Sequence, residues 1–452
     1  MADDDDKQVY DLDGSKLLGN VRIFTNGLSK IKYSTISKDV ERLKDSKNLG
    51  ELLSLLQDTH QKLDRLGIFK GLTSTIDRGE REGDVDVVLT FEEKPALYTA
   101  GASVNSKTKA GVEFKGEIPG IFGSSNTLTL SANTAGTGNN ELTGSFYIPR
   151  IPLMDKFTGL FSVFTSFNDL KKYCSYTNRT KGFKFMLSNI NQRHNFVWES
   201  SIRDVYPVFN DRMKASEMVL RNSGCSLKNS LSYVYKYDGT KGDGVPTEGQ
   251  LTQIKLESGL PGGDSLFFKF NYNMLYSKQL FRKLIMNLNL GCGYLYNFGP
   301  YNKNANLLDK FNFTGPSGSH LALRGFRFQG LGPYDHGLVI NENDEWVEKI
   351  DHLGGDYYAN LELSLYYPLK FIQTPKPMLF SFFNVGSLSN STSRFDLYNQ
   401  VFNDLRMSVG AGLSLNLARG CWLEAFYAKP LVYFPSDSIS NFQLGLRFKQ
   451  SM

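Results

Sequence analysis

The sequence predicts a mainly β protein in which a small α+β domain precedes a long antiparallel β region. Apolar residues recur at helical spacing only before residue 95, and period-two alternation recurs from there to the end of the chain. The chain also holds 42 Gly, 33 Phe and 23 Tyr, which suits many strands joined by tight turns and flanked by aromatic side chains. We therefore assign residues 17–94 to the small domain and residues 95–452 to the β region.

The first sixteen residues are kept apart from both regions. Asp3 to Asp6, followed by Lys7, form an acidic run that is either a native tail or the remnant of an enteropeptidase-type cleavage tag. Neither a secretory signal peptide nor an Arg-rich presequence stands at the N-terminus.

The small domain is predicted from one helix and three strands. Residues 21–24 suit a short strand, and leucines at helical spacing follow Asn48, which is a suitable N-cap with Glu51 placed as in a capping box. Gly67 is expected to end the helix. Alternation then predicts strands over residues 72–76 and 85–91.

The β region shows its clearest strands over residues 357–367, 408–417 and 442–449, where apolar residues alternate with polar residues or glycine. Such alternation fits both a soluble β-sandwich and a membrane β-barrel, and by itself leaves the choice open. The region is long and lacks a dividing linker, which favours the barrel. Aromatic pairs such as Tyr366-Tyr367 stand at strand ends and match the aromatic belts of membrane interfaces, which favours it further. No run reaches the ~18 apolar residues of a membrane helix.

The most specific motif is Leu323, Arg324, Gly325 and Phe326, which we call the signature turn. It lies in an ordered series over residues 309–355 that includes Gly-Pro elements, a charged segment over residues 334–351 and a Gly-Gly-Asp element. The series resembles the signature loop of the outer-membrane barrel-assembly (BamA) superfamily. Within it, the chain is most similar to the barrel subunits at the centre of the mitochondrial sorting and assembly machinery.

This resemblance implies a transmembrane antiparallel β-barrel of about sixteen strands preceded by one POTRA (polypeptide-transport-associated) domain, with a loop over about residues 309–353 folded inside. It implies membrane insertion and folding of β-barrel precursor proteins in the mitochondrial outer membrane, with the POTRA domain in the intermembrane space. The implied partners are β-barrel precursors, membrane lipids and accessory subunits of a sorting and assembly complex. The alternative is a protein-translocating or passive pore of the same superfamily, in a chloroplast envelope or a bacterial outer membrane.

The resemblance also places Arg324 inside the barrel against later strands. Gly325 lets the backbone turn or approach the wall closely, and Phe326 can pack between the loop and the wall. Glu362 lies on the polar side of its strand and is the expected carboxylate partner, because a buried guanidinium without one would be costly. Asn384 can bond Arg324 but cannot neutralise it, so charge pairing is expected to rest on Glu362. The first and last strands are expected to form a lateral gate that consists of Leu97, Tyr98, Thr99, Gly101, Val104, Phe442, Leu444, Gly445, Leu446 and Phe448.

An enzyme, a cofactor protein or a nucleic-acid binder is not indicated. The five histidines are dispersed, with no H-E-x-x-H motif, phosphate loop or dinucleotide fingerprint. Asp351 and His352 are expected to be surface polar residues rather than metal ligands. A net charge of +5 without a clustered basic face gives no sign of nucleic-acid binding.

Overall fold

The structure is a computed structural model of the chain. It describes residues 17–81, 83–105, 109–135, 139–151, 154, 156–242, 245–298, 306–313, 322–369, 377–390, 402–418 and 421–448. The acidic run from Asp3 to Lys7 and the Gly-Pro element of the signature series at Gly315 and Pro316 lie outside the described residues.

The small domain is a three-stranded sheet packed against one long helix. Its strands are ordered β1-β3-β2, with β1 parallel and β2 antiparallel to β3. Leucines of the helix and the apolar side chains of β3 form one buried core. The predicted order of strand, helical region, strand and strand is confirmed, and the elements are β1 (Val21–Asn26), α1 (Ser37–Val40), α2 (Leu49–Arg65), β2 (Phe69–Arg78) and β3 (Val85–Glu93).

Helix α2 begins and ends where its capping residues predict. Asn48 is the N-cap, and its side chain accepts a hydrogen bond of 2.7 Å from the backbone N–H of Glu51. The Glu51 carboxylate accepts from the N–H of Lys47 at 2.9 Å instead of the N–H of Asn48, so the expected capping box is shifted by one residue. Gly67 follows the helix with φ of 72°, a conformation that glycine adopts without strain.

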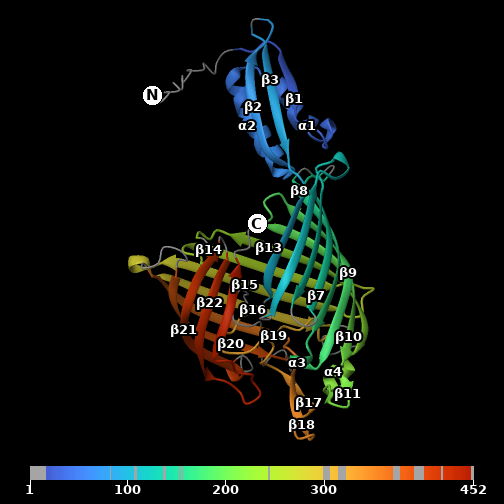
Figure 1. Cartoon of the computed structure of the whole chain (residues 1–452), viewed down its shortest axis with the longest axis vertical. Coiled ribbons are helices and arrows are strands. Elements are labelled where there is room, and N and C mark those ends of the chain that lie inside the picture. The colour runs from blue at the N-terminus through green and yellow to red at the C-terminus, as the bar shows by residue number, and fades with distance from the viewer. Residues whose placement is uncertain are drawn as a thin grey trace. The chain divides into compact units, whose positions relative to one another are not determined.

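The β region forms one sheet of sixteen strands in which every described pairing is antiparallel (Figure 1). Neighbours in the sheet are neighbours in sequence except where β11, β12, β17 and β18 branch off, and β4 and β23 stand at the two ends of the order. The strands are β4 (Leu97–Asn105), β5 (Lys109–Pro119), β6 (Thr127–Ala135), β7 (Asn139–Ile148), β8 (Phe157–Asp169), β9 (Tyr176–Asn189), β10 (His194–Pro207), β13 (Gly224–Asp238), β14 (Gly249–Gly259), β15 (Phe267–Gln279), β16 (Ile285–Asn297), β19 (Tyr357–Pro368), β20 (Pro377–Ser389), β21 (Leu405–Ala418), β22 (Cys421–Val432) and β23 (Phe442–Phe448).

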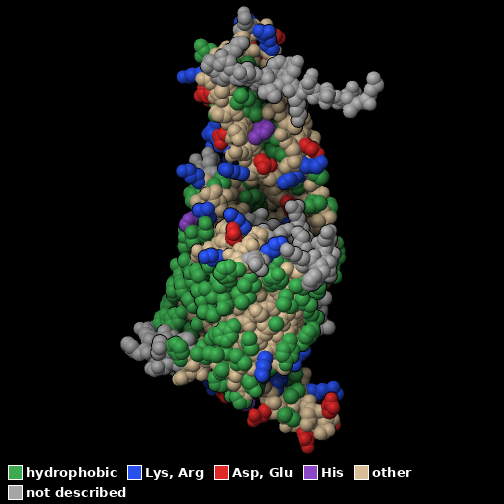
Figure 2. Space-filling model, turned by 90° about the vertical axis from the view of Figure 1, so that its left-hand side faces the viewer, with side chains coloured by type: hydrophobic (Ala, Val, Ile, Leu, Met, Phe, Trp, Pro, Cys, Tyr) green, Lys and Arg blue, Asp and Glu red, His purple; other side chains and the backbone are tan. Residues whose placement is uncertain are grey.

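The polarity of this sheet is the reverse of that of a soluble β-sandwich. In β19, Leu361 is 36% exposed whereas its neighbour Glu362 is 7% exposed, and β21 repeats the pattern with Leu413 outside and Ser414 buried. On the face that Figure 2 displays, apolar side chains cover much of the surface of the β region. Polar side chains such as Glu257 and Asn273 are buried instead. Apolar side chains in contact with solvent over a whole sheet face are unfavourable in water but suit lipid. The alternation that the sequence left open is therefore decided in favour of the membrane arrangement.

A second, four-stranded sheet contains the charged segment at residues 334–351. The segment is a β-hairpin, β17 (Tyr334–Ile340) and β18 (Trp346–His352), which pairs with β12 (Met213–Lys214) and through it with β11 (Phe209–Asn210). In sequence, helix α3 (Lys171–Cys174) lies between β8 and β9, and helix α4 (Glu217–Arg221) lies between β12 and β13. Among the described residues, none of the helices is long and apolar enough to cross a membrane.

Candidate functional site

The signature turn is buried against the inner face of the large sheet, by which we mean the face that carries Glu362. Arg324 is 1% exposed, and its guanidinium contacts two carboxylates. Nη1 donates to Glu362 Oε1 on β19, and Nη2 donates to Glu424 Oε2 on β22 at 3.0 Å. Charge-assisted bonds of this kind are stronger than neutral ones and fix the plane of the guanidinium.

Two hydroxyl groups donate further hydrogen bonds to these carboxylates. Ser364 Oγ donates to Glu362 at 2.7 Å and accepts from Arg324 Nη1 at 3.3 Å. The Tyr366 hydroxyl donates to Glu424 Oε1 at 3.4 Å. Tyr366 is fully buried, so its expected place in an outer aromatic belt is wrong; only its neighbour Tyr367 is exposed.

Three phenyl rings surround the guanidinium. Its central carbon lies 5.2 Å from the ring centre of Phe380, 4.9 Å from that of Phe382 and 5.4 Å from that of Phe426. The ring faces are electron-rich and attract the cation, and they exclude water from its ion pairs. Arg324 is therefore held by charge and by shape together.

The backbone of the turn is fastened to the last strands. Gly325 has φ of 94°, a conformation that favours glycine, and a Cβ there would make tight contacts of 3.3 Å with side-chain atoms of Ala428 and Ser408. Ser408 Oγ on β21 donates to the carbonyl of Arg324 at 2.6 Å. Gln443 on β23 accepts from the N–H of Gly325 at 2.9 Å and donates to the carbonyl of Phe326 at 2.7 Å.

The apolar members of the turn pack into a buried cluster. Leu323 and Phe326 join Phe313 and, on the sheet, Tyr358 and Leu388. This is the expected position of Phe326, between loop and wall.

The expectation that charge pairing rests on Glu362 is incomplete, because Glu424 carries a second ion pair. Sequence reasoning overlooked Glu424 although it is an acidic residue at an inward position of an alternating strand. Asn384 contacts the backbone of the turn. With its amide oxygen turned toward the loop, it accepts from the backbone N–H of Arg324 at 2.9 Å, so it bonds Arg324 without neutralising the guanidinium, as expected.

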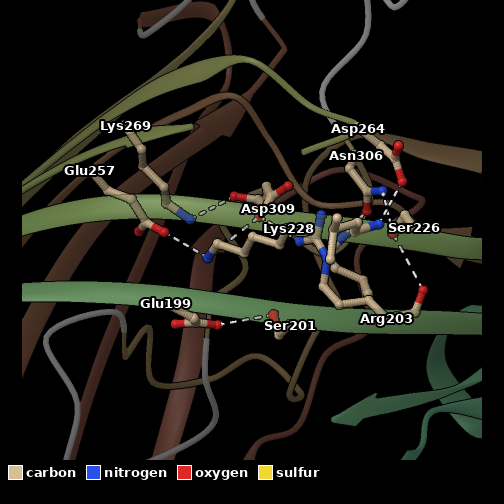
Figure 3. Close-up of polar contacts among 12 residues, drawn as sticks. Glu199, Ser201, Arg203, Ser226, Lys228, Glu257, Asp264, Lys269, Asn306 and Asp309 are labelled. Atoms are coloured by element: carbon tan, nitrogen blue, oxygen red, sulfur yellow. Dashed lines mark hydrogen bonds and ion pairs between the residues drawn. The ribbon is translucent and has the colours of Figure 1, made fainter. Parts of the chain in front are cut away.

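The beginning of the loop is held by a separate charged cluster on earlier strands (Figure 3). Asp309 accepts from Arg203 on β10 at 2.7 Å, and its backbone carbonyl accepts from Lys269 on β15 at 2.6 Å. Lys228 on β13 lies 2.6 Å from Glu257 and 3.9 Å from Asp309. The loop is thus tied to β10–β15 at its start and to β19–β23 at the signature turn.

Asp351 and His352 are buried at the base of the β17–β18 hairpin, so their expected surface location is wrong. Asp351 accepts from Ser175 Oγ at 2.6 Å and from the N–H of Ser216 at 3.1 Å. Burial lowers the pKa of His352 to about 4. These contacts join the hairpin to the segments that follow β8 and β12.

The predicted gate residues lie on the two end strands of the sheet. Leu97, Tyr98, Phe442 and Leu444 are exposed. Thr99 and Gly101 also lie in β4, and Gly445 in β23. The side chains of Val104, Leu446 and Phe448 lie outside the described residues. No backbone pairing between β4 and β23 occurs among the described residues, so the structure does not bring the two halves of the predicted gate together.

The described residues contain no group of three His, Cys, Asp or Glu side chains arranged to hold a metal ion. The arrangement around Arg324 holds a loop in one position on the inner face of the sheet, through ion pairs and hydrogen bonds among buried polar groups.

Comparison with known proteins shows which ones this chain resembles in sequence. It is 26% identical over 448 residues to the Sorting and assembly machinery component 50 homolog B of Xenopus laevis, with 94% of this chain and 90% of the relative covered. It is also 26% identical to the human Sorting and assembly machinery component 50 homolog, with 94% and 89% covered. These relatives confirm the resemblance inferred from the signature series.

Among solved structures, BamA from Haemophilus ducreyi lacking POTRA domains 1–3 matches with a TM-score of 0.75 at 18% identity, over 94% of this chain and 83% of that one. The likeness shows a BamA-like barrel fold. Residues 121–448 match the Omp85 superfamily domain, which covers most of the chain. The chain therefore belongs to the Omp85 superfamily.

Proposed function

We propose that this protein inserts and folds β-barrel precursor proteins in the mitochondrial outer membrane, without a covalent step. The relatives are named for sorting and assembly, and they match nearly the whole chain. The outward apolar face of the sheet suits an integral position in lipid. In this proposal the sixteen strands close into a barrel, the domain at residues 17–94 is a single POTRA domain in the intermembrane space, and accessory subunits join the barrel in a complex.

The observation that carries the proposal is the contact between the signature turn and the last strand. Gln443 is buried on β23, and both of its amide atoms bond the backbone of the turn. The same turn is anchored through Arg324 to β19 and β22. The position of the loop and the position of the last strand are therefore mechanically linked.

The last strand, β23, is the shortest of the sixteen strands in the sheet. β23 has seven residues whereas β22 has twelve, and its described backbone pairing is to β22 alone. The outer edge of β23 and the free edge of β4 each carry N–H and C=O groups that lipid cannot satisfy. A precursor strand can satisfy them by β-augmentation, so we propose that precursors enter through a lateral gate between β4 and β23.

Site-specific crosslinking tests this gate. Single cysteines along β4, for example at Thr99 or Gly101, are expected to crosslink to a cysteine in the C-terminal strand of an arrested precursor. Cysteines in β9, such as at Phe185 on the outer face, serve as the control. Crosslinks confined to the small domain would contradict the proposal.

A locked seam gives the second test. A disulfide between β4 and β23 is expected to abolish precursor insertion, and reduction is expected to restore it. A passive pore, the alternative within the superfamily, would keep conducting ions or polypeptides while locked, with no crosslinks from β4 to the precursor.

A further inference from the structure

A cavity on the inner face of the sheet lies beside the start of the signature loop. Its volume is about 270 Å³, and its lining consists of Lys255, Lys269, Asn271, Lys310, Phe311 and Asn312. The first three come from the neighbouring strands β14 and β15, where Lys255 is paired directly with Asn271. The other three belong to the stretch that leads to the signature turn. The cavity is therefore a junction between the wall and the loop.

The three lysines that line this cavity are not each paired with a carboxylate of their own. Lys255 lies 2.8 Å from Glu257, but Glu257 also serves Lys228 at 2.6 Å. Lys310 lies 3.5 Å from Asp356. Lys269 has no ion pair within 4.0 Å among the described residues, and its Nζ donates to the backbone carbonyl of Asp309.

The surrounding cluster does not remove the excess of positive charge. Figure 3 shows Lys228, Lys269 and Glu257 grouped around Asp309. Together with Arg203, Lys255 and Lys310, the cluster holds five cations, and the carboxylates bonded to them are Glu257, Asp309 and Asp356. A fourth carboxylate, Glu199, also acts on Lys228 but is itself paired with Lys184 at 3.4 Å. With that pair counted, six cations face four carboxylates among the described residues, so two positive charges remain in excess, whereas buried charges are normally paired.

The other lining groups suit a polar guest. The side-chain oxygen of Asn271 already accepts from the Tyr358 hydroxyl and from Asn273, which leaves the amide N–H groups of Asn271 for a ligand. Phe311 lies against Lys269, whose Nζ is 4.3 Å from the ring centre, and closes one side with an apolar wall. A water molecule takes about 30 Å³, so the space admits a small ion with part of its hydration but not a folded peptide segment.

We propose that this cavity binds a small multivalent oxyanion of the phosphate type, held by Lys255, Lys269 and Lys310. Lysine is a common phosphate ligand as a point charge, and convergent lysines in a cavity with low-dielectric walls concentrate the field on an anion. The bound anion bridges β14 and β15 to the loop through Lys310. It therefore clamps the beginning of the loop whose other end carries Arg324. This proposal is independent of the activity proposed above.

Thermal unfolding of the full chain in detergent micelles tests the proposal, followed by intrinsic tryptophan fluorescence. Inorganic phosphate is titrated against sodium chloride at matched ionic strength. A ligand that binds the folded state alone is expected to raise the melting temperature saturably, by about 2–5 °C. Lys269→Gln is expected to abolish this rise. The control is Lys184→Gln, because Lys184 pairs with Glu199 at 3.4 Å and does not line the cavity. This variant is expected to leave the rise unchanged.

A second variant keeps the proposal testable if Lys269→Gln fails to fold. Asn271→Asp supplies a carboxylate inside the cavity, so it is expected to raise the melting temperature without phosphate and to remove the response to phosphate. Equal shifts in phosphate and chloride would overturn the proposal. A phosphate response that persists in both Lys269→Gln and Asn271→Asp would also overturn it, because the anion would then bind elsewhere.

Discussion

Replacing Arg324 with methionine tests whether the buried ion pairs hold the signature turn. Methionine keeps the apolar contacts with the three phenyl rings but leaves Glu362 and Glu424 buried without a cation. Breaking a buried pair in this way costs about 3–5 kcal/mol. The turn keeps four hydrogen bonds, through Asn384, Ser408 and both amide atoms of Gln443, at about 1 kcal/mol each. The two magnitudes are similar, so we expect the turn to leave the wall in a large fraction of molecules.

The assay combines thermal unfolding in detergent micelles with precursor insertion into vesicles that contain the purified protein. We expect Arg324→Met to lower both the melting temperature and the insertion rate while the protein stays membrane-embedded. The control is Arg221→Met, because Arg221 forms an exposed pair with Glu217, and such pairs contribute about 0–1 kcal/mol.

A compensating variant separates the physical cause from other roles of the arginine. Arg324→Met combined with Glu362→Gln and Glu424→Gln removes the two orphaned charges while keeping side-chain size. Replacing a buried ionic cluster with neutral groups is often neutral or stabilising, so the melting temperature is expected to recover. If the single variant unfolds like the wild type, or the triple variant is no more stable than the single one, the reasoning is refuted.

Three further outcomes are expected. Gly325→Ala forces a Cβ onto a residue with φ of 94° and is expected to lower stability by about 1–3 kcal/mol in the same unfolding assay, whereas Gly101→Ala, with no atoms within 4 Å of the added Cβ, is the control. Burial opposes ionisation of Glu93, but hydrogen bonds from the backbone N–H groups of residues 29–31 and from a serine hydroxyl lower its pKa. The small domain should therefore lose stability as pH falls through that depressed pKa. Glu93→Gln should lower stability at neutral pH and make stability depend less on pH in the acid range, as measured by circular dichroism. Removing the residues before Pro95 is expected to leave the sheet membrane-embedded, and loss of resistance to carbonate extraction would contradict that boundary.

Most of the helices and strands named in the sequence analysis could be predicted from local sequence patterns. The N-cap at Asn48, the glycine after α2 and the alternation in β19, β21 and β23 depend on residues a few positions apart, so the chain reveals them directly. Alternation likewise placed Glu362 on the polar face of its strand. Gly325 was expected where the backbone turns, and its positive φ agrees.

The contacts that complete the site depend on tertiary structure. Glu424 lies 100 residues from Arg324 in sequence, and Gln443 lies 118 residues from Gly325. Which inward side chains meet the loop is decided by the register of β19 to β23 and by where the loop comes to rest, and neither leaves a local signal. The burial of Asp351 was missed for the same reason, since it follows from pairing of the hairpin with β12.

The sequence by itself determined the periodicity, the order of the elements and the signature turn, because these depend on side-chain spacing along one strand or helix. It could not decide which face of the sheet is buried, since the same alternation serves a dry core and a lipid surface. Only the tertiary structure decided that, by burying polar side chains such as Ser414 and leaving apolar neighbours such as Leu361 and Leu413 exposed. The fold also supplies the oppositely charged partners of Asp309 and Arg324 in the signature loop, and without these partners burying the two charges would be unfavourable.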